Sequence, residues 1–101
     1  MMTIINKQAL AEQDLANIWL YTWHEWGEQQ ADFYLDELER AIKLLADQPM
    51  LGRQREELGS SVCIFYHAHH LLVYRVIKGG ISIVRVLHKN MDVDMQIDLT
   101  P

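Results

Sequence analysis

Residues 70–88 have the sequence HLLVYRVIKGGISIVRVLH, two apolar segments separated by a pair of glycines. Residues 71–78 and 81–88 are rich in β-branched and aromatic side chains, which is typical of β-strands. Gly79-Gly80 between them is a strong signal for a two-residue hairpin turn. This stretch therefore predicts an antiparallel β-hairpin, around which the rest of the fold is arranged.

A two-residue turn at Gly79-Gly80 places Arg75 opposite Val84 and Tyr74 opposite Arg85. Alternation along each strand then defines two faces. One face has Leu71, Val73, Arg75, Ile77, Val84, Val86 and His88, and the other has Leu72, Tyr74, Val76, Ile81, Ile83, Arg85 and Leu87. Both faces are largely apolar, although a sheet covered by one helical layer needs only one such face. We therefore expect a second cover, and we expect Arg85 and His88 on opposite faces.

The sequence before the hairpin predicts a further strand at Val62–Tyr66, a polar connection at 47–60 and two helices at 8–26 and 28–46. Apolar side chains recur at helical spacing in both helices. The faces are Leu15, Ile18, Trp19, Thr22 and Trp26 in the first helix, and Ala31, Tyr34, Leu35, Leu38, Ile42 and Leu45 in the second. Because only Gly27 separates the helices, they form an antiparallel hairpin. A short strand at Met2–Ile5 precedes them, so the predicted class is α+β with the order β-α-α-β-β-β.

Four large apolar side chains lie away from the predicted core faces of the helices. They are Leu20, Tyr21, Phe33 and Leu44. Clustered apolar surface usually marks an interaction site, whereas isolated exposed apolar residues are normal. Together with the second apolar sheet face, these residues predict a surface for a partner.

Length and composition restrict the class of protein. The chain has 101 residues, which suits one domain spanning 1–101, and a net charge of −5, which argues against direct binding to nucleic acid phosphates. The single Cys63 cannot form an internal disulfide, which favours a reducing compartment such as the cytoplasm. No apolar run is long enough to cross a membrane, and the start of the chain lacks the order of a signal peptide. Apolar residues alternate in residues 91–101, which suits an added strand or a docking tail.

The chain has few signs of catalytic or metal chemistry. It lacks a glycine-rich phosphate loop, a Cys-x-x-Cys pair and a Gly-x-Ser-x-Gly elbow. Residues 24–28 have an incomplete zinc motif, which we interpret as a solvated helix end, and His67-Ala68-His69-His70 suits a polar turn better than a metal site. We expect neither a metal nor a cofactor.

A different chemistry remains open, because metal-free RNA cleavage needs a base, a cation beside the phosphate and an acid for the leaving oxygen. Glu56 or Glu57, Arg75 or Arg85, and His88 supply those residue types. A solvated strand position explains Arg75 equally well.

The order of elements and the motifs within them resemble the ParE branch of the RelE/ParE toxin superfamily over nearly the whole chain. The helical motifs are Ala11 with Asp14-Leu15, Ile18 and Tyr21, then Trp26-Gly27, Gln30-Ala31, Tyr34 and Leu38, then Leu45-Ala46 with Pro49 and Gly52. The most specific part is residues 70–75 followed by residues 81–88 and Met91-Asp92. The chain departs from common members at Ser60-Ser61-Val62, where an Arg often begins the strand, and at its His-rich turn, where Gly is usual.

The resemblance implies the toxin of a bacterial type II toxin–antitoxin pair, bound by a wrapping, ParD-like or equivalent antitoxin in a hetero-oligomer. ParE-type toxins block DNA gyrase by protein contact, whereas RelE-type relatives cut mRNA in the ribosome. The acidic composition favours the gyrase branch and a toxin that is not an enzyme, since entry to the ribosome favours a basic surface.

The resemblance also suggests site residues. For antitoxin contact we expect Leu20, Tyr21, Phe33, Leu44, Tyr74, Arg85 and Leu87. For target contact we expect Arg85, His88, Met91 and Asp92, although the long stem of Arg85 also suits a structural role at the core edge. The alternative, a ribosome-dependent endonuclease, would use Glu57, Arg75 and His88 as its catalytic residues.

Overall fold

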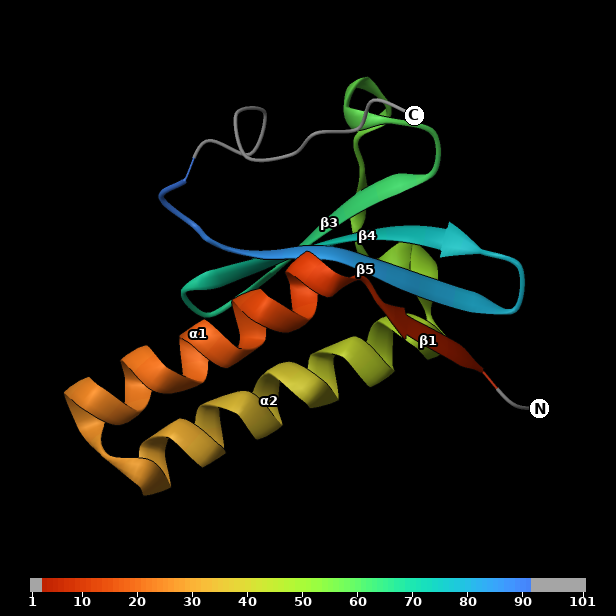
Figure 1. Ribbon diagram of the computed structural model, residues 1–101. Helices are drawn as coiled ribbons and strands as arrows, with labels where there is room; N and C mark the ends of the chain where they lie inside the picture. Colours follow the sequence, from red (N-terminus) through yellow and green to blue (C-terminus); the bar gives the residue numbers. More distant parts are fainter. Residues whose placement is uncertain (1–2, 92–101) are drawn as a thin grey trace.

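A computed structural model describes residues 3–91 of the protein, with two helices packed on one face of a five-stranded sheet (Figure 1). The helices are α1 (Ala9–Trp26) and α2 (Glu28–Asp47). The strands are β1 (Ile4–Lys7), β2 (Arg53–Gln54), β3 (Val62–His67), β4 (His70–Ile77) and β5 (Gly80–His88), and the 3-10 helices are η1 (Pro49–Leu51) and η2 (Glu56–Leu58). The predicted α+β class is confirmed.

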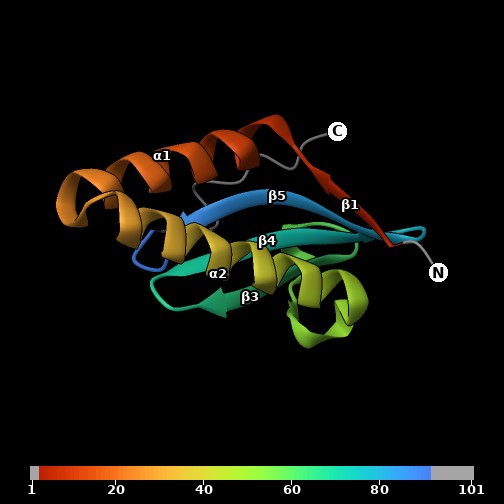
Figure 2. The same cartoon turned by 90° about the horizontal axis from the view of Figure 1, so that it is seen from below.

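The sheet is larger than the predicted three-stranded one. Its strand order is β1-β5-β4-β3-β2, and β1 runs parallel to β5 while the other neighbours are antiparallel. The first strand begins two residues later than predicted, and β2 lies within the segment that the sequence predicted to be a polar connection. The helices and the sheet form two layers (Figure 2).

The two helices form the predicted antiparallel hairpin. Gly27 joins them with a φ of 95°, a backbone conformation that other residues rarely adopt. The indole N–H of Trp19 on α1 donates to Asp32 Oδ1 on α2 over 2.9 Å. At the other end, the Nζ of Lys7 on β1 lies 2.7 Å from Glu39 on α2. The first contact joins the two helices, and the second joins α2 to the sheet.

The predicted register of the β4–β5 hairpin is wrong. Ile77 pairs with Gly80, so Lys78 and Gly79 form the turn, and Gly79 takes the positive φ of 83°. Gly80 belongs to the strand because β1 passes against it: a Cβ there would lie 1.8 Å from the backbone oxygen of Ile4. Close backbone approach, rather than turn geometry, is therefore the role of the second glycine.

Arg75 consequently pairs with Ser82, and Tyr74 with Ile83. A bulge follows, because Val73 pairs with Arg85 and leaves Val84 as an extra residue in β5. The bulge shifts the alternation of side chains, so Val86 and Leu87 exchange the faces that the sequence predicted for them.

Both sheet faces are buried within the chain. The cluster under the helices includes Leu38, Ile42, Leu72, Ile83 and Val86. The opposite face forms a second cluster of Leu58, Val62, Ile64, Leu71, Val73, Val84 and Leu87. These side chains are buried, so the structure does not leave this face as exposed apolar surface. The predicted added strand or docking tail lies, after Met91, outside the described residues.

Candidate functional site

A groove lies where the helical hairpin extends beyond the sheet. Both ribbon views show the connection between α1 and α2 projecting past the ends of β3, β4 and β5 (Figures 1 and 2). Trp26 lies on the predicted core face of α1, yet it is 74% exposed because it lies at the overhanging end of the hairpin. The space under the overhang has a volume of about 950 Å³.

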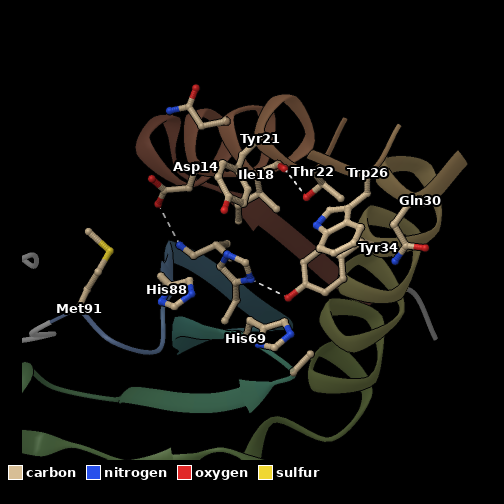
Figure 3. Close-up of a pocket in the computed structure, with 14 residues that line it drawn as sticks. Asp14, Ile18, Tyr21, Thr22, Trp26, Gln30, Tyr34, His69, His88 and Met91 are labelled. Atoms are coloured by element: carbon tan, nitrogen blue, oxygen red, sulfur yellow. Dashed lines mark hydrogen bonds between the residues drawn. The ribbon is translucent and has the colours of Figure 1, made fainter. Parts of the chain in front are cut away.

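Three parts of the fold form the walls of this groove (Figure 3). From α1 come Asp14, Asn17, Ile18, Tyr21, Thr22 and Trp26; from α2 come Gln30 and Tyr34; from the sheet side come Ala68, His69, His70, Val86, His88 and Met91. The lining combines apolar and aromatic side chains with a few amide and imidazole groups. Such a surface suits an amphipathic peptide segment.

Tyr34 and two histidines form the polar part of the groove. Tyr34 Oη lies 2.6 Å from His70 Nδ1, and the ring of His88 meets that of His70 edge-on at 5.5 Å. Burial, followed by the charges of His88, His69 and His67, lowers the pKa of His70 to about 4. Burial also raises the pKa of Tyr34. At neutral pH the phenol and the imidazole are therefore both uncharged, and the hydrogen bond between them forms the polar wall of the groove.

At the other end of the groove, Asp14 joins α1 to β5. Its Oδ2 accepts from Arg85 Nε over 2.7 Å and from the backbone N–H of Val86 over 2.9 Å, and its Oδ1 accepts from Arg85 Nη2 over 3.0 Å. The hydrogen bonds and charge of Asp14 raise the pKa of Arg85. Arg85, predicted to contact both the antitoxin and the target, thus has the structural role that the sequence left open.

The residues predicted to contact the antitoxin separate into two groups. Leu20, Tyr21, Phe33 and Leu44 are exposed, from 41% for Leu44 to 67% for Tyr21. Tyr74 and Leu87 are buried completely or nearly so, which corrects their assignment as surface contacts. Tyr74 belongs to the core beneath the helices, and the bulge turns Leu87 into the opposite cluster.

Two of the residues predicted to contact the target, His88 and Met91, line the groove, while Asp92 lies outside the described residues. Arg85 and His88 were expected on opposite faces, and the bulge does not change this expectation, because it lies at Val84, before both residues. His88 lines the groove, and Arg85 binds Asp14, which also lines it. The sequence missed Tyr34, which it assigned to the helix core, and Gln30. One signal could have found them: the apolar face of the helices is longer than the predicted strands, so part of it must extend beyond the sheet.

The structure does not bring the predicted endonuclease residues together. Arg75 pairs with Val62 at the start of β3, whereas His88 pairs with His70 at the other end of β4. Five residues of extended strand separate Arg75 from His70, which is about 16 Å. Glu57 lies in η2 and binds Arg55. The prediction that these three residues form a single catalytic site is therefore wrong.

Within residues 3–91, no group of three or more His, Cys, Asp or Glu side chains is arranged to hold a metal ion. Neither helix of that region is long and apolar enough to span a membrane.

Comparison with known proteins identifies the family of the chain. A family model described as "ParE toxin of type II toxin-antitoxin system, parDE" matches residues 5–93, so the chain belongs to the ParE toxin family. It is 41% identical to Toxin ParE1 of Mycobacterium tuberculosis over 88 residues, covering 86% of this chain and 90% of that relative. It is 35% identical to Toxin ParE1 of Caulobacter vibrioides over 82 residues, covering 81% and 84%.

A solved structure shares the fold. The chromosomal ParDE system from P. aeruginosa contains a chain that matches with a TM-score of 0.71 and 19% identity, covering 86% of this chain and 96% of that chain.

Proposed function

We propose that this toxin acts on DNA gyrase by protein contact, without catalysing a reaction of its own, in the cytoplasm of its host. The observation that carries the proposal is the match to the ParE family over residues 5–93. The net charge of −5 supports it, because a ribosomal nuclease must approach a strongly anionic RNA surface. The separation of Arg75 from His88 supports it as well, since the alternative needs both groups at one phosphate.

We further propose that a ParD-like antitoxin neutralises the toxin by wrapping around the helical hairpin. Phe33 and Leu44 lie on the face of α2 opposite its buried stripe, whereas Tyr21 lines the groove under the hairpin. A flat partner surface contacts only one side of a hairpin. An extended segment that passes around the hairpin can cover both, which favours a partner that folds on binding.

A supercoiling assay with purified gyrase, relaxed DNA and ATP tests the proposed target. Titration with the toxin is expected to reduce the supercoiled product and to produce linear DNA from trapped cleavage complexes, and addition of the cognate antitoxin is expected to reverse both effects. A parallel translation reaction with ribosomes, scored for cleaved mRNA, is expected to show intact message. Cleaved message with unaffected gyrase would overturn the proposal in favour of the endonuclease.

A further inference from the structure

The outer edge of β5 loses its neighbouring strand partway along its length. The last pair between β1 and β5 is Lys7 with Ile83, and the N–H of Gln8 donates to the oxygen of Ile83 over 3.0 Å. The chain then enters α1 at Ala9. Beyond Ile83, β1 therefore supplies no hydrogen-bond partner to this edge, and buried backbone N–H groups need one.

Asp14, in the second turn of α1, supplies the acceptor that β1 does not. The backbone N–H of Val86 donates to Asp14 Oδ2, and the guanidinium of Arg85 binds both oxygens of the same carboxylate. The side chain of Asp14 is 14% exposed and that of Arg85 is 18% exposed. The carboxylate of Asp14 thus accepts hydrogen bonds from the side chain of Arg85 and from the backbone of Val86, in a site mostly shielded from water.

These two residues directly follow the bulge at Val84. Before the bulge, Ile83 belongs to the cluster under the helices, and Val84 belongs to the opposite cluster. After it, Val86 returns to the helical side and lines the groove with His88. Continuous alternation from Ile83 would instead send the side chains of Val86 and His88 to the opposite face.

We infer that Asp14 is a positioning residue of the groove, which holds the β5 bulge in place and so directs Val86 and His88 toward the binding surface. The effect of Asp14 on antitoxin affinity, unlike its effect on the bulge, rests on the proposed function.

Three variants separate this role from a general contribution to stability. Asp14→Ala removes the acceptor for both partners, and Arg85→Lys keeps the bond between Asp14 and Val86 but removes the fork of the guanidinium. Glu39→Gln is the matched control, because it breaks the ion pair between Glu39 and Lys7 but leaves the hydrogen bonds of Asp14 to Arg85 and Val86 in place. If Asp14→Ala fails to fold, Asp14→Leu replaces it, since its side chain is close in shape to that of aspartate and accepts no hydrogen bond.

Amide hydrogen exchange, followed by NMR on the full-length toxin, measures the bulge directly. In Asp14→Ala the Val86 amide is expected to exchange at least about tenfold faster than in the wild type, relative to the amides of β4, because a hydrogen bond to a charged acceptor is lost. The cross-peaks between the rings of His88 and His70 are expected to weaken. Both signals are expected to stay near wild type in Arg85→Lys and Glu39→Gln.

Isothermal titration with the cognate antitoxin then measures the consequence for binding. Asp14→Ala is expected to weaken binding by at least about tenfold at a temperature where it is folded, and Glu39→Gln by less than about threefold. Unchanged Val86 exchange in Asp14→Ala, or in Asp14→Leu where that replaces it, would overturn the inference. A wild-type toxin that binds no antitoxin would instead contradict the proposed function and leave the exchange result standing.

Discussion

Tyr74→Phe removes a single hydroxyl group that connects the sheet to the segment after α2. Tyr74 is fully buried, its Oη accepts from the N–H of Gly52 over 2.9 Å, and it donates to the oxygen of Pro49 over 2.6 Å. Burial, followed by the neighbouring thiol of Cys63, raises the pKa of Tyr74 to about 12. The hydroxyl therefore stays protonated at neutral pH and keeps both bonds.

The cost of the substitution follows from the groups that it leaves behind. Gly52 is buried, so its N–H loses its acceptor without access to water, at a cost of about 1–3 kcal/mol. The bond to the oxygen of Pro49 adds about 1 kcal/mol. The total of about 2–4 kcal/mol is a large fraction of the 5–15 kcal/mol or so that stabilises a typical domain. At about 4–8 °C per kcal/mol, the melting temperature is expected to fall by about 8–32 °C.

Urea unfolding of Tyr74→Phe and Tyr66→Phe makes the comparison. Tyr66 lies on β3, is 63% exposed and undergoes the same chemical change, so its variant is expected to stay within about 0.5 kcal/mol of the wild type. Antitoxin affinity is expected to stay within about threefold in both variants. Equal stability of the two variants would refute the hydrogen-bond argument, and a selective loss of antitoxin binding in Tyr74→Phe would restore Tyr74 as a contact residue.

Three further predictions concern the helix surface, the groove and the glycines. Phe33→Ala is expected to leave the unfolding free energy within about 0.5 kcal/mol, because the side chain is 58% exposed, and to weaken antitoxin binding by about tenfold or more in titration calorimetry; an unchanged affinity would remove Phe33 from the interface. His70 is harder to protonate in the folded chain, where its pKa is about 4, than in the unfolded chain, at about 6.5. His70 therefore makes the unfolding free energy fall as the pH drops between those values. In urea titrations, a His70→Asn variant is expected to lose less stability than the wild type between about pH 7 and about pH 5. Equal losses in the two proteins would contradict this. Gly80→Ala is expected to destabilise more than Gly27→Ala in thermal unfolding, because a Cβ at Gly80 meets the backbone of Ile4, whereas Gly27 has open space and only its φ of 95° to oppose substitution; equal losses would contradict this.

The sequence predicted most of the fold because the decisive signals are local. Helical spacing placed both helices within one residue of their bounds, and β-branched runs located the last three strands. The same patterns correctly marked Leu20, Tyr21, Phe33 and Leu44 as lying outside the core. The sequence did not predict which strands become neighbours at the two edges of the sheet, where β1 lies beside β5 and β2 beside β3. These pairings depend on where the chain returns, which periodicity does not encode.

The errors about Tyr74, Leu87 and the register each come from a feature that the alternating pattern of a strand does not show, and for Leu87 that feature is the bulge at Val84. The sequence treats a strand as an alternating pattern set by its own turn, but Gly80 is held in the strand by the backbone of β1. The burial of Tyr74 has a similar cause, since its hydroxyl meets the backbone of a segment 22 residues away, at Gly52. A tyrosine in an apolar strand gives no sign of whether such a partner exists.

The groove forms where two regular elements are irregular. The helical hairpin is longer than the sheet beneath it, and the alternation of side chains along β5 shifts at Val84. Neither mismatch is favourable for an isolated element, because one exposes Trp26 and the other leaves the N–H of Val86 without a strand partner. Asp14 resolves the second mismatch from within the chain. The exposure of Trp26 has no such compensation in the described chain, so a partner that covers the overhang would stabilise the folded chain by binding it.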